Sequence, residues 1–353
     1  MRRRDFGQVL SAGIAAAVST SCEKSTIDDR SRKPGKALMY VGCQYMGTSV
    51  KELQFLKRFG VNNMDGPAGD FVLEEMIKHK EKAAKEGISL DMVHLDIRGP
   101  VVLSDGPERD RKIDLVCEHI KTASKAGIRG LNYYLAYLGV MRTENTPGRG
   151  GTTYSTWEYE KAPKGQLSKA GVIPAELFWE RITYFLERVI PVATEYKVQM
   201  ACHPHDPGTP PGYRGVDRVM GTVEGLKHFI EISPSPYHGL NFCVGTVAEM
   251  LENPGREIDN VVRYFGERKK IFNVHLRNIR GKRGNFMEVY PDEGDMNFHK
   301  LTQVFRDVEY PYMLMPDHAP GHPDEAGMGR LSPSFAFEIG YIKAMIQAVN
   351  DEV

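Results

Sequence analysis

The sequence predicts an α/β protein built as a single (β/α)₈ barrel. Short apolar segments alternate with longer amphipathic segments about eight times from residue 37 onward, which is the order that builds a parallel barrel. No change of composition marks a second domain. The chain has 353 residues, of which 41% are hydrophobic and 26% charged. This is an ordinary globular composition, and a barrel with insertions accommodates the length.

The predicted strands are short runs rich in aliphatic, aromatic and β-branched residues. In chain order they are residues 38–43, 60–64, 89–95, 128–134, 198–203, 240–244, 271–277 and 311–317. The predicted helices carry apolar residues at helical spacing. They are residues 50–58, 72–86, 109–126, 175–196, 222–231, 257–267, 297–307 and 334–349. The longest insertion, residues 144–171, follows the fourth strand, so we expect it to overhang the catalytic face of the barrel.

The first 22 residues have the pattern of an export signal. Three arginines, Arg2 to Arg4, precede a short apolar stretch that is too short to span a bilayer in the mature protein. The Arg3-Arg4-x-Phe6 run resembles a twin-arginine signal, and Cys22 is a candidate for lipid attachment. We therefore expect residues 23–36 to be a linker, residues 37–353 to be the catalytic barrel, and the protein to be periplasmic or anchored to the membrane facing the periplasm.

The charge balance limits the class of partner. Lys plus Arg and Asp plus Glu both total 46, so the formal net charge is zero. Nucleic acid and anionic membrane surfaces bind proteins with a basic excess, and neither is expected as the main partner. Five cysteines in this length do not form a disulfide framework. A small-molecule substrate is expected, and the sequence is compatible with a homo-oligomer.

Four residues of metal-ligating type fall at the ends of four consecutive predicted strands. They are His203, Cys243, His275 and Asp317, at the ends of strands five to eight. Strands of a barrel end at the face that carries the active site, so these side chains are expected to converge there. Imidazole, thiolate and carboxylate all bind divalent metals. One such residue alone is more simply explained as a core histidine, a buried cysteine or a helix cap, but four in succession predict a metal site.

Other polar residues cluster at the same level of the barrel. A sugar acid would require an arginine for its carboxylate and hydrogen-bonding groups for its hydroxyls. Arg277 is a candidate catalytic residue. The candidates for substrate binding are Asn132, Arg142, His205, Asn278 and Glu288, and His94 and Asp96 end the third strand. For His205, a turn role within His203-Pro204-His205-Asp206-Pro207 is an equal alternative. The remaining acidic residues of the loop after Glu288 are equally well explained as a solvated surface turn.

Over residues 38–345 the motifs resemble those of the mannonate dehydratases, a family of the xylose-isomerase-like barrel superfamily. The matching runs are Asn132-Tyr133 with Arg142-Thr143, Phe185 to Ala193, His203 to Pro207, Asn241-Phe242-Cys243, His275 to Asn278, Phe286-x-Glu288, Gly294-Asp295-Met296 and Pro316-Asp317-His318. The chain departs from the family at His205, where an aspartate is usual, and at Met141, where a tryptophan is usual. It also lacks the tyrosine that precedes the Gly329-Arg330-Leu331 motif.

The resemblance implies a hydro-lyase that converts D-mannonate to 2-keto-3-deoxy-D-gluconate and water. It implies a Mn²⁺-type site at the four residues named above, with His318 as an acid/base group and Arg277 beside it. Because cysteine favours softer ions, Fe²⁺ and Zn²⁺ are alternatives to Mn²⁺. If the reaction needs a second acid, His205, Tyr290 and His322 are the candidates.

Two other functions are compatible with these residues. The first is a different metal-assisted reaction on the same barrel, namely exported sugar isomerisation, epimerisation or lyase cleavage of an oxidised glycoside. The second is a non-catalytic carbohydrate-binding barrel, which would have no need of the ligand set. Arg142 and Arg277 favour an acidic substrate over a neutral sugar.

Overall fold

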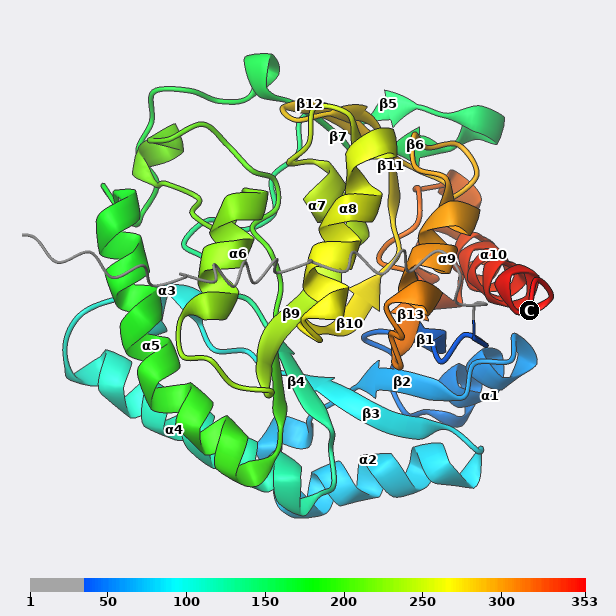
Figure 1. Ribbon diagram of the computed structural model, residues 1–353, viewed down its shortest axis with the longest axis horizontal. Coiled ribbons are helices and arrows are strands. Elements are labelled where there is room, and N and C mark those ends of the chain that lie inside the picture. Colours follow the sequence, from blue (N-terminus) through cyan, green and yellow to red (C-terminus); the bar gives the residue numbers. More distant parts are fainter. Residues whose placement is uncertain (1–34) are drawn as a thin grey trace, which may run out of the picture. The chain divides into compact units, whose positions relative to one another are not determined.

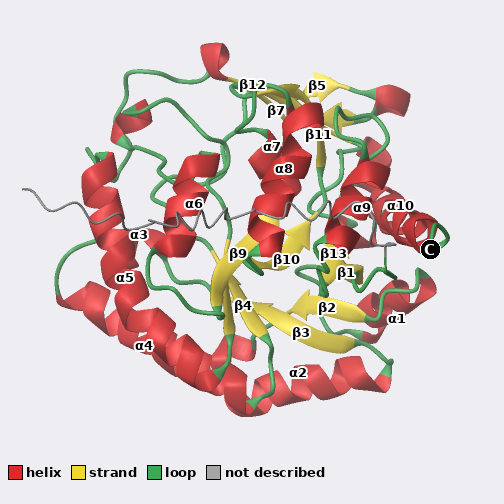
Figure 2. Ribbon diagram, in the orientation of Figure 1, coloured by secondary structure: helices red, strands yellow, loops and turns green. Residues whose placement is uncertain are grey.

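The computed structural model describes residues 35–353, which form a closed barrel of eight parallel strands with helices around it (Figures 1 and 2). The order around the barrel is β1-β2-β3-β4-β8-β9-β10-β13. Strand β1 pairs with both β2 and β13, and this pairing closes the barrel. The predicted fold class is confirmed. The strands are β1 (Tyr40–Cys43), β2 (Asn63–Gly66), β3 (Ser89–His94), β4 (Gly130–Tyr133), β8 (Gln199–Cys202), β9 (His238–Cys243), β10 (Ile271–His275) and β13 (Met313–Met315).

Each predicted helix is present. They are α1 (Val50–Arg58), α2 (Leu73–Lys85), α4 (Pro107–Lys125), α5 (Ala175–Tyr196), α6 (Val223–Glu231), α8 (Pro254–Glu267), α9 (Phe298–Asp307) and α10 (Pro333–Asn350); the short α3 (Gly99–Val102) and α7 (Val244–Ala248) were not predicted. Helix α1 illustrates how local sequence favours a helix, through a capped first turn and an apolar face. Ser49 caps its first turn in a reciprocal pair with Glu52, while Leu53 and Leu56 are buried.

The predicted insertion folds into small strands beside the barrel. It supplies β5 (Thr146–Pro147), β6 (Thr153–Tyr154) and β7 (Thr156–Glu158), and β7 pairs with a hairpin of β11 (Asn278–Lys282) and β12 (Asn285–Val289). These strands gather in one place, at the top of Figure 1. Because β11 follows directly after β10, the sheet lies at the end of the barrel where the strands finish. Single 3₁₀ turns occur at Gly69–Phe71, Arg149–Gly151, Tyr159–Lys161, Tyr213–Gly215, Pro323–Glu325 and Gly329–Leu331.

Strand β2 begins later than predicted. Gly60 adopts a left-handed conformation, with φ of +74°, directly after the end of α1. The predicted residues 60–62 therefore form a turn, and the strand starts at Asn63.

The leader falls outside the described residues. The predicted export signal at residues 1–22, Cys22 and the linker up to residue 34 are among the residues that the structure does not describe. Within residues 35–353, no helix combines the length and apolar character needed to cross a membrane.

The barrel interior carries its own apolar cluster, separate from the main core between strands and helices. It consists of Met92, Ala201, Phe272, Met313 and Met315, which come from four strands. These side chains fill the barrel, so that the strand ends form a closed floor rather than a channel.

Candidate active site

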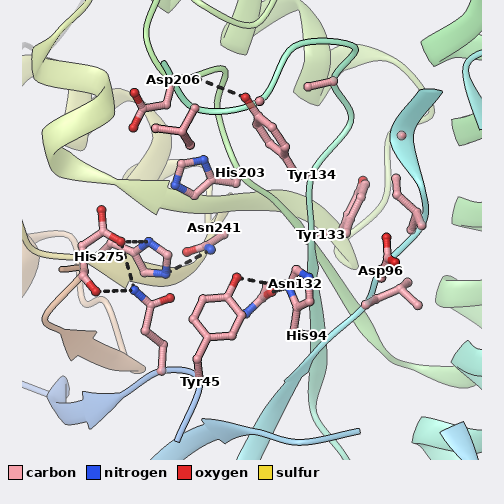
Figure 3. Close-up of a pocket in the computed structure, with 18 of the residues that line it drawn as sticks. Tyr45, His94, Asp96, Asn132, Tyr133, Tyr134, His203, Asp206, Asn241 and His275 are labelled. Atoms are coloured by element: carbon pink, nitrogen blue, oxygen red, sulfur yellow. Dashed lines mark hydrogen bonds and ion pairs between the residues drawn. The ribbon is translucent and has the colours of Figure 1, made fainter. Parts of the chain in front are cut away.

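A cavity of about 550 Å³ opens at the carboxyl ends of the barrel strands. Residues at or just after seven strands line it, including Tyr45 after β1, His94 at the end of β3 and Asn132 in β4. Figure 3 shows these side chains together with His203 and His275, which follow or end strands on another side of the barrel. The cavity thus occupies the place where barrel enzymes bind substrate.

Three of the four predicted metal ligands, His203, His275 and Asp317, line this cavity, and the buried Cys243 lies beside them. Candidate ligand atoms of His203, Cys243 and His275 all lie within 4.8 Å of one another. Asp317 joins them, because its Oδ2 lies 3.3 Å from the sulfur of Cys243 and its Oδ1 lies 3.3 Å from Nδ1 of His275. These are two nitrogen donors, one sulfur and one carboxylate from four different strands, a donor set that suits a divalent transition metal.

The electrostatics of this group fit a cation. Burial raises the pKa of the Cys243 thiol, and the negative charge of Asp317 raises it further. Burial would also raise the pKa of Asp317, but His318, His275 and Arg277 hold it well below its usual value. In addition, Nδ1 of His275 is buried and makes no hydrogen bond, although Oδ1 of Asp317 lies 3.3 Å away. A bound cation would stabilise the thiolate and use this unpartnered nitrogen.

Neighbouring side chains orient the candidate ligands. Gln44, which is fully buried after β1, donates through Nε2 to Oδ1 of Asp317 at 3.0 Å. The Asn241 amide lies 3.2 Å from Nε2 of His275, and Nδ1 of His203 lies 2.7 Å from the Pro204 carbonyl oxygen. Such contacts fix the rotamers of metal ligands.

Arg142 and Arg277 are already paired with carboxylates. Arg277 donates to Glu288 at 2.6 Å and to Glu249 at 2.6 Å, and it lies 3.3 Å from Asp206. Arg142 also pairs with Asp206 and Glu288. These three carboxylates are buried, and neither guanidinium lines the cavity. The expectation that these two arginines receive the substrate carboxylate is therefore corrected, because buried acidic residues of the protein occupy them.

Buried charges in this network shift one another's pKa. Burial would raise the pKa of Asp206, but Arg142 and Arg277 lower it well below its usual range. Burial raises the pKa of Glu249 well above its usual value, and the charge of Asp206 raises it further. The network thus consists of two arginines and three buried carboxylates, and it contacts the candidate metal ligands where Arg277 lies 3.4 Å from Asp317.

His318 lies between this network and the cavity. Its side chain is 46% exposed, with Nδ1 2.8 Å from Oε2 of Glu288 and Nε2 3.0 Å from Nη1 of Arg277. Burial would lower the pKa of His318, but the carboxylates of Asp317 and Glu288 raise it. Because arginine only donates, the contact with Arg277 makes Nε2 an acceptor and places the ring proton on Nδ1, toward Glu288. The ring lines the cavity beside Asp317.

Of the predicted substrate-binding residues, Asn132 lines the cavity, whereas Arg142, His205, Asn278 and Glu288 do not. His205 is buried, its Nε2 lies 2.7 Å from the Leu135 carbonyl, and its Nδ1 accepts from the Met220 amide. Burial lowers the pKa of His205 to about 3, so its ring is neutral. These bonds favour the turn role for His205 and correct the expectation of substrate contact.

Asn278 also has a structural role. Its Nδ2 donates to the carbonyl oxygens of Pro291 and Met296, and its Oδ1 accepts from the Ile279 amide. The candidates for a second acid lie elsewhere too. Tyr290 bonds Ser334 at 2.7 Å and His322 bonds the Gly150 carbonyl at 3.1 Å, and neither lines the cavity.

The structure adds cavity residues that sequence reasoning missed, above all Arg330. Its guanidinium lies 5.1 Å from the ring centre of Tyr45 and 5.4 Å from that of Phe335. Among the described residues, no carboxylate lies within ion-pair distance of it, and its Nε is buried without a partner. Gln44 and Tyr45 follow β1 just as the predicted ligands follow their strands. Their position directly after a strand is the signal by which the sequence could indicate them.

Comparisons with known proteins identify the family of the chain. The family model described as D-mannonate dehydratase (UxuA) matches residues 155–352. A mannonate dehydratase from Thermotoga petrophila is 30% identical over 298 residues, which cover 72% of this chain and 79% of that protein. One from Endomicrobium trichonymphae is 29% identical over 296 residues, covering 72% and 78%.

Solved structures show the same fold. The mannonate dehydratase from Streptococcus suis serotype2 superposes with a TM-score of 0.76 at 20% identity, covering 88% of this chain and 94% of that one. A D-tagatose 3-epimerase-like protein superposes with a TM-score of 0.57 at 13% identity, covering 88% and 98%. The family model matches more than half of this chain, and the alignments with the two relatives cover more than three quarters of each relative's length. The chain therefore belongs to the mannonate dehydratase family.

Proposed function

We propose that this protein dehydrates D-mannonate to 2-keto-3-deoxy-D-gluconate and water with the help of one divalent ion. The observation that carries the proposal is the convergence of His203, Cys243, His275 and Asp317 on one another at the edge of the cavity, directly beside His318. Membership of the family and the names of the relatives support the same reaction.

The four converging residues would hold the ion. Mn²⁺ is the first choice by family, while the Cys243 sulfur also suits Fe²⁺ and Zn²⁺. When bound, a divalent ion supplies electrostatic stabilisation for negative charge that develops on substrate oxygens. This matters because the C2 proton lies beside a carboxylate and is only weakly acidic, so its removal needs such stabilisation.

His318 is the proposed base for the C2 proton. Glu288 fixes the ring through Nδ1, so Nε2 is the nitrogen with the free electron pair, and the ring is the exposed member of the network. To accept a proton, Nε2 must exchange its hydrogen bond from Arg277 for contact with the substrate. General base assistance of this kind contributes about 10²–10⁴-fold to a rate.

Arg330 is the proposed partner of the substrate carboxylate. It lines the cavity, and within residues 35–353 no acidic side chain neutralises it. Arg142 and Arg277 cannot serve because their guanidiniums are held by Asp206, Glu249 and Glu288. A planar guanidinium binds a carboxylate through two parallel hydrogen bonds, which orients the acid end of the sugar.

Metal analysis and a substrate screen test the proposal together. The purified protein should contain one divalent ion per chain, and Cys243→Ser and His275→Ala should each reduce that content. Incubation with a panel of aldonic acids should give a 2-keto-3-deoxy product from D-mannonate, with neutral hexoses as the comparison. Full metal content in both variants would show that the ion site is wrongly placed, and turnover of neutral sugars alone would contradict the dehydratase.

We also propose that the protein acts outside the cytoplasm, on the evidence of the twin-arginine-like run at Arg3 and Arg4. That route transports folded proteins, so the ion would be acquired inside the cell before export.

A further inference from the structure

A directional chain of hydrogen bonds ends at Tyr45 on the cavity wall. Asn132 donates through Nδ2 to the carboxylate of Asp65, so its other atom, Oδ1, is an acceptor. Nδ1 of His94 lies 2.7 Å from that Oδ1 and must therefore carry the ring proton. The Tyr45 hydroxyl oxygen lies 3.2 Å from the same Nδ1, so it can only accept, and it shares the single Nδ1 proton with the nearer Asn132 Oδ1. The hydroxyl proton of Tyr45 is therefore not used in this hydrogen bond and is available to another acceptor.

The hydroxyl proton of Tyr45 is available to the cavity that this residue lines. Tyr45, His94 and Asn132 all line it, and Figure 3 shows their polar atoms gathered at its edge, with His203, His275 and Asn241 across from them. His318 and Asp317 line the same cavity. A substrate held there would lie between Tyr45 and His318.

The backbone conformation of Tyr45 supports a functional role for this residue. Its φ is +50°, in the left-handed region that residues with a Cβ seldom adopt. Such a conformation is strained and persists where the surroundings impose it, often at sites of function. Here the neighbour Gln44 is fastened to Asp317, and the guanidinium of Arg330 packs on the tyrosine ring. The aromatic side chain is thereby held at the cavity.

The proposed dehydration needs two proton transfers. One removes the proton from C2, which is the role proposed for His318. The other must protonate the C3 hydroxyl, because hydroxide is a poor leaving group unless it departs as water. The candidates for this acid named from sequence, His205, Tyr290 and His322, do not line the cavity.

We propose that Tyr45 is a further catalytic residue, which donates its hydroxyl proton to the C3 hydroxyl as that group leaves. This inference rests on the proposed dehydratase function. The C2–H bond breaks and its proton moves to His318, while its electron pair forms the C2–C3 double bond. The C3–O bond breaks, and the hydroxyl leaves as water with the proton from Tyr45. The resulting enol becomes the 2-keto acid by gaining a proton at C3 and losing the one on its oxygen. The extra proton on His318 and the missing one on Tyr45 then balance through solvent.

The protonation state of Tyr45 agrees with a donor. Burial raises the pKa of Tyr45, and the carboxylates of Asp65 and Asp317 raise it further. The hydroxyl therefore keeps its proton at neutral pH. The hydrogen bond from His94 would stabilise the oxygen after the proton has left.

Substituting Tyr45→Phe removes the proton and keeps the ring that packs against Arg330. Tyr137→Phe is the matched control, since Tyr137 also lines the cavity but its hydroxyl donates to the Leu103 carbonyl oxygen and accepts from Arg181 at 2.8 Å. Tyr134→Phe tests the rival acid, because Tyr134 lines the cavity and its oxygen accepts from Arg218 at 2.7 Å and from the Asp206 amide, which leaves its own proton free. With metal-loaded proteins and D-mannonate, Tyr45→Phe should lower kcat by at least about 100-fold. Metal content and the affinity for D-mannonate should stay close to wild type, and Tyr137→Phe and Tyr134→Phe should both stay within a few fold of wild-type kcat.

The outcomes separate the two proposals. A wild-type protein that does not dehydrate D-mannonate overturns the proposed function, and this inference with it. An active wild type together with a near-normal Tyr45→Phe overturns this inference alone. So does a loss of activity that occurs in Tyr134→Phe and not in Tyr45→Phe, because the acid would then be Tyr134.

A substrate with a better leaving group tests the position of the transferred proton. In 3-deoxy-3-fluoro-D-mannonate the group that leaves C3 is fluoride, which is a weaker base than hydroxide and depends less on an acid. The defect of Tyr45→Phe relative to wild type should be at least about 10-fold smaller on this analogue than on D-mannonate. An equal defect on both substrates would show that Tyr45 does not protonate the leaving group.

Discussion

Gln44 and Asp317 are joined by a hydrogen bond of 3.0 Å although they stand 273 positions apart in the chain. Gln44 follows β1 and Asp317 follows β13, the two strands whose pairing closes the barrel. The same amide also donates to the Asp317 backbone carbonyl at 3.0 Å. Closure of the barrel and orientation of a candidate metal ligand therefore depend on the same pair of residues.

Gln44→Ala should weaken metal binding by about 10–100-fold, because Asp317 loses the donor that fixes its carboxylate. Metal affinity can be measured by titrating the metal-free protein, and kcat should recover at saturating metal. Gln54→Ala, which changes an exposed glutamine on α1, is the control and should bind metal as wild type does. Unchanged affinity in Gln44→Ala would mean that Gln44 has no part in orienting Asp317.

His318→Asn should keep the fold and the metal but lower kcat by at least about 100-fold, since asparagine cannot accept the C2 proton. The measurement is kcat on D-mannonate at saturating metal. Excess metal would rescue a variant in which His318 only orients Asp317, but it cannot replace a missing base. Turnover close to wild type would remove His318 from the mechanism.

Arg330→Gln should raise KM for the sugar acid by about 10–100-fold, because a charged hydrogen bond to a carboxylate contributes about 1.5–3 kcal/mol. Arg330→Lys, which keeps the charge but loses the paired donors, should fall between wild type and Arg330→Gln. Steady-state kinetics over a range of D-mannonate concentrations would show this order. A KM that does not change in Arg330→Gln would mean that the carboxylate binds elsewhere.

Stability should depend on pH through His238, which is buried at the start of β9 with Nε2 2.8 Å from the Phe229 carbonyl. Burial lowers the pKa of His238 to about 4 from its ordinary 6.5. Between these values the unfolded chain binds a proton that the folded chain does not, so falling pH favours unfolding. Above 6.5 the histidine is neutral in both states and contributes no pH dependence.

The neutral variant His238→Gln isolates this contribution. The free energy of unfolding of wild type should fall relative to that of the variant by about 3 kcal/mol as the pH drops from 6.5 to 4, at about 1.4 kcal/mol per pH unit. Urea unfolding at several pH values measures it. Parallel pH profiles of the two proteins would contradict the assignment.

Export should require the arginine pair of the leader. Replacing Arg3 and Arg4 together by Lys should keep the protein in the cytoplasm, because the twin-arginine route depends on that pair. Fractionation of expressing cells followed by metal analysis of each fraction tests it. Periplasmic accumulation equal to that of wild type would rule the route out.

Local patterns in the sequence determined the elements of the fold. Helix α5 was predicted with its observed bounds, Ala175–Tyr196, since its apolar spacing is a property of one continuous segment. The positions of His203, Cys243, His275 and Asp317 could be predicted too. In a barrel every strand ends at the same face, so strand order and strand ends are enough to bring these residues together.

The tertiary structure alone decided which charges are paired and which are free. Arg142 reaches Glu288 across 146 positions of sequence, through an insertion whose path has no periodic pattern. The sequence therefore could not show that Arg142 and Arg277 are occupied while Arg330 is free at the cavity. The same holds for the contact of Tyr45 with His94. Pairing between side chains depends on how loops fold back over the strand ends, and that is set by the packing of the whole barrel and not by any segment of it.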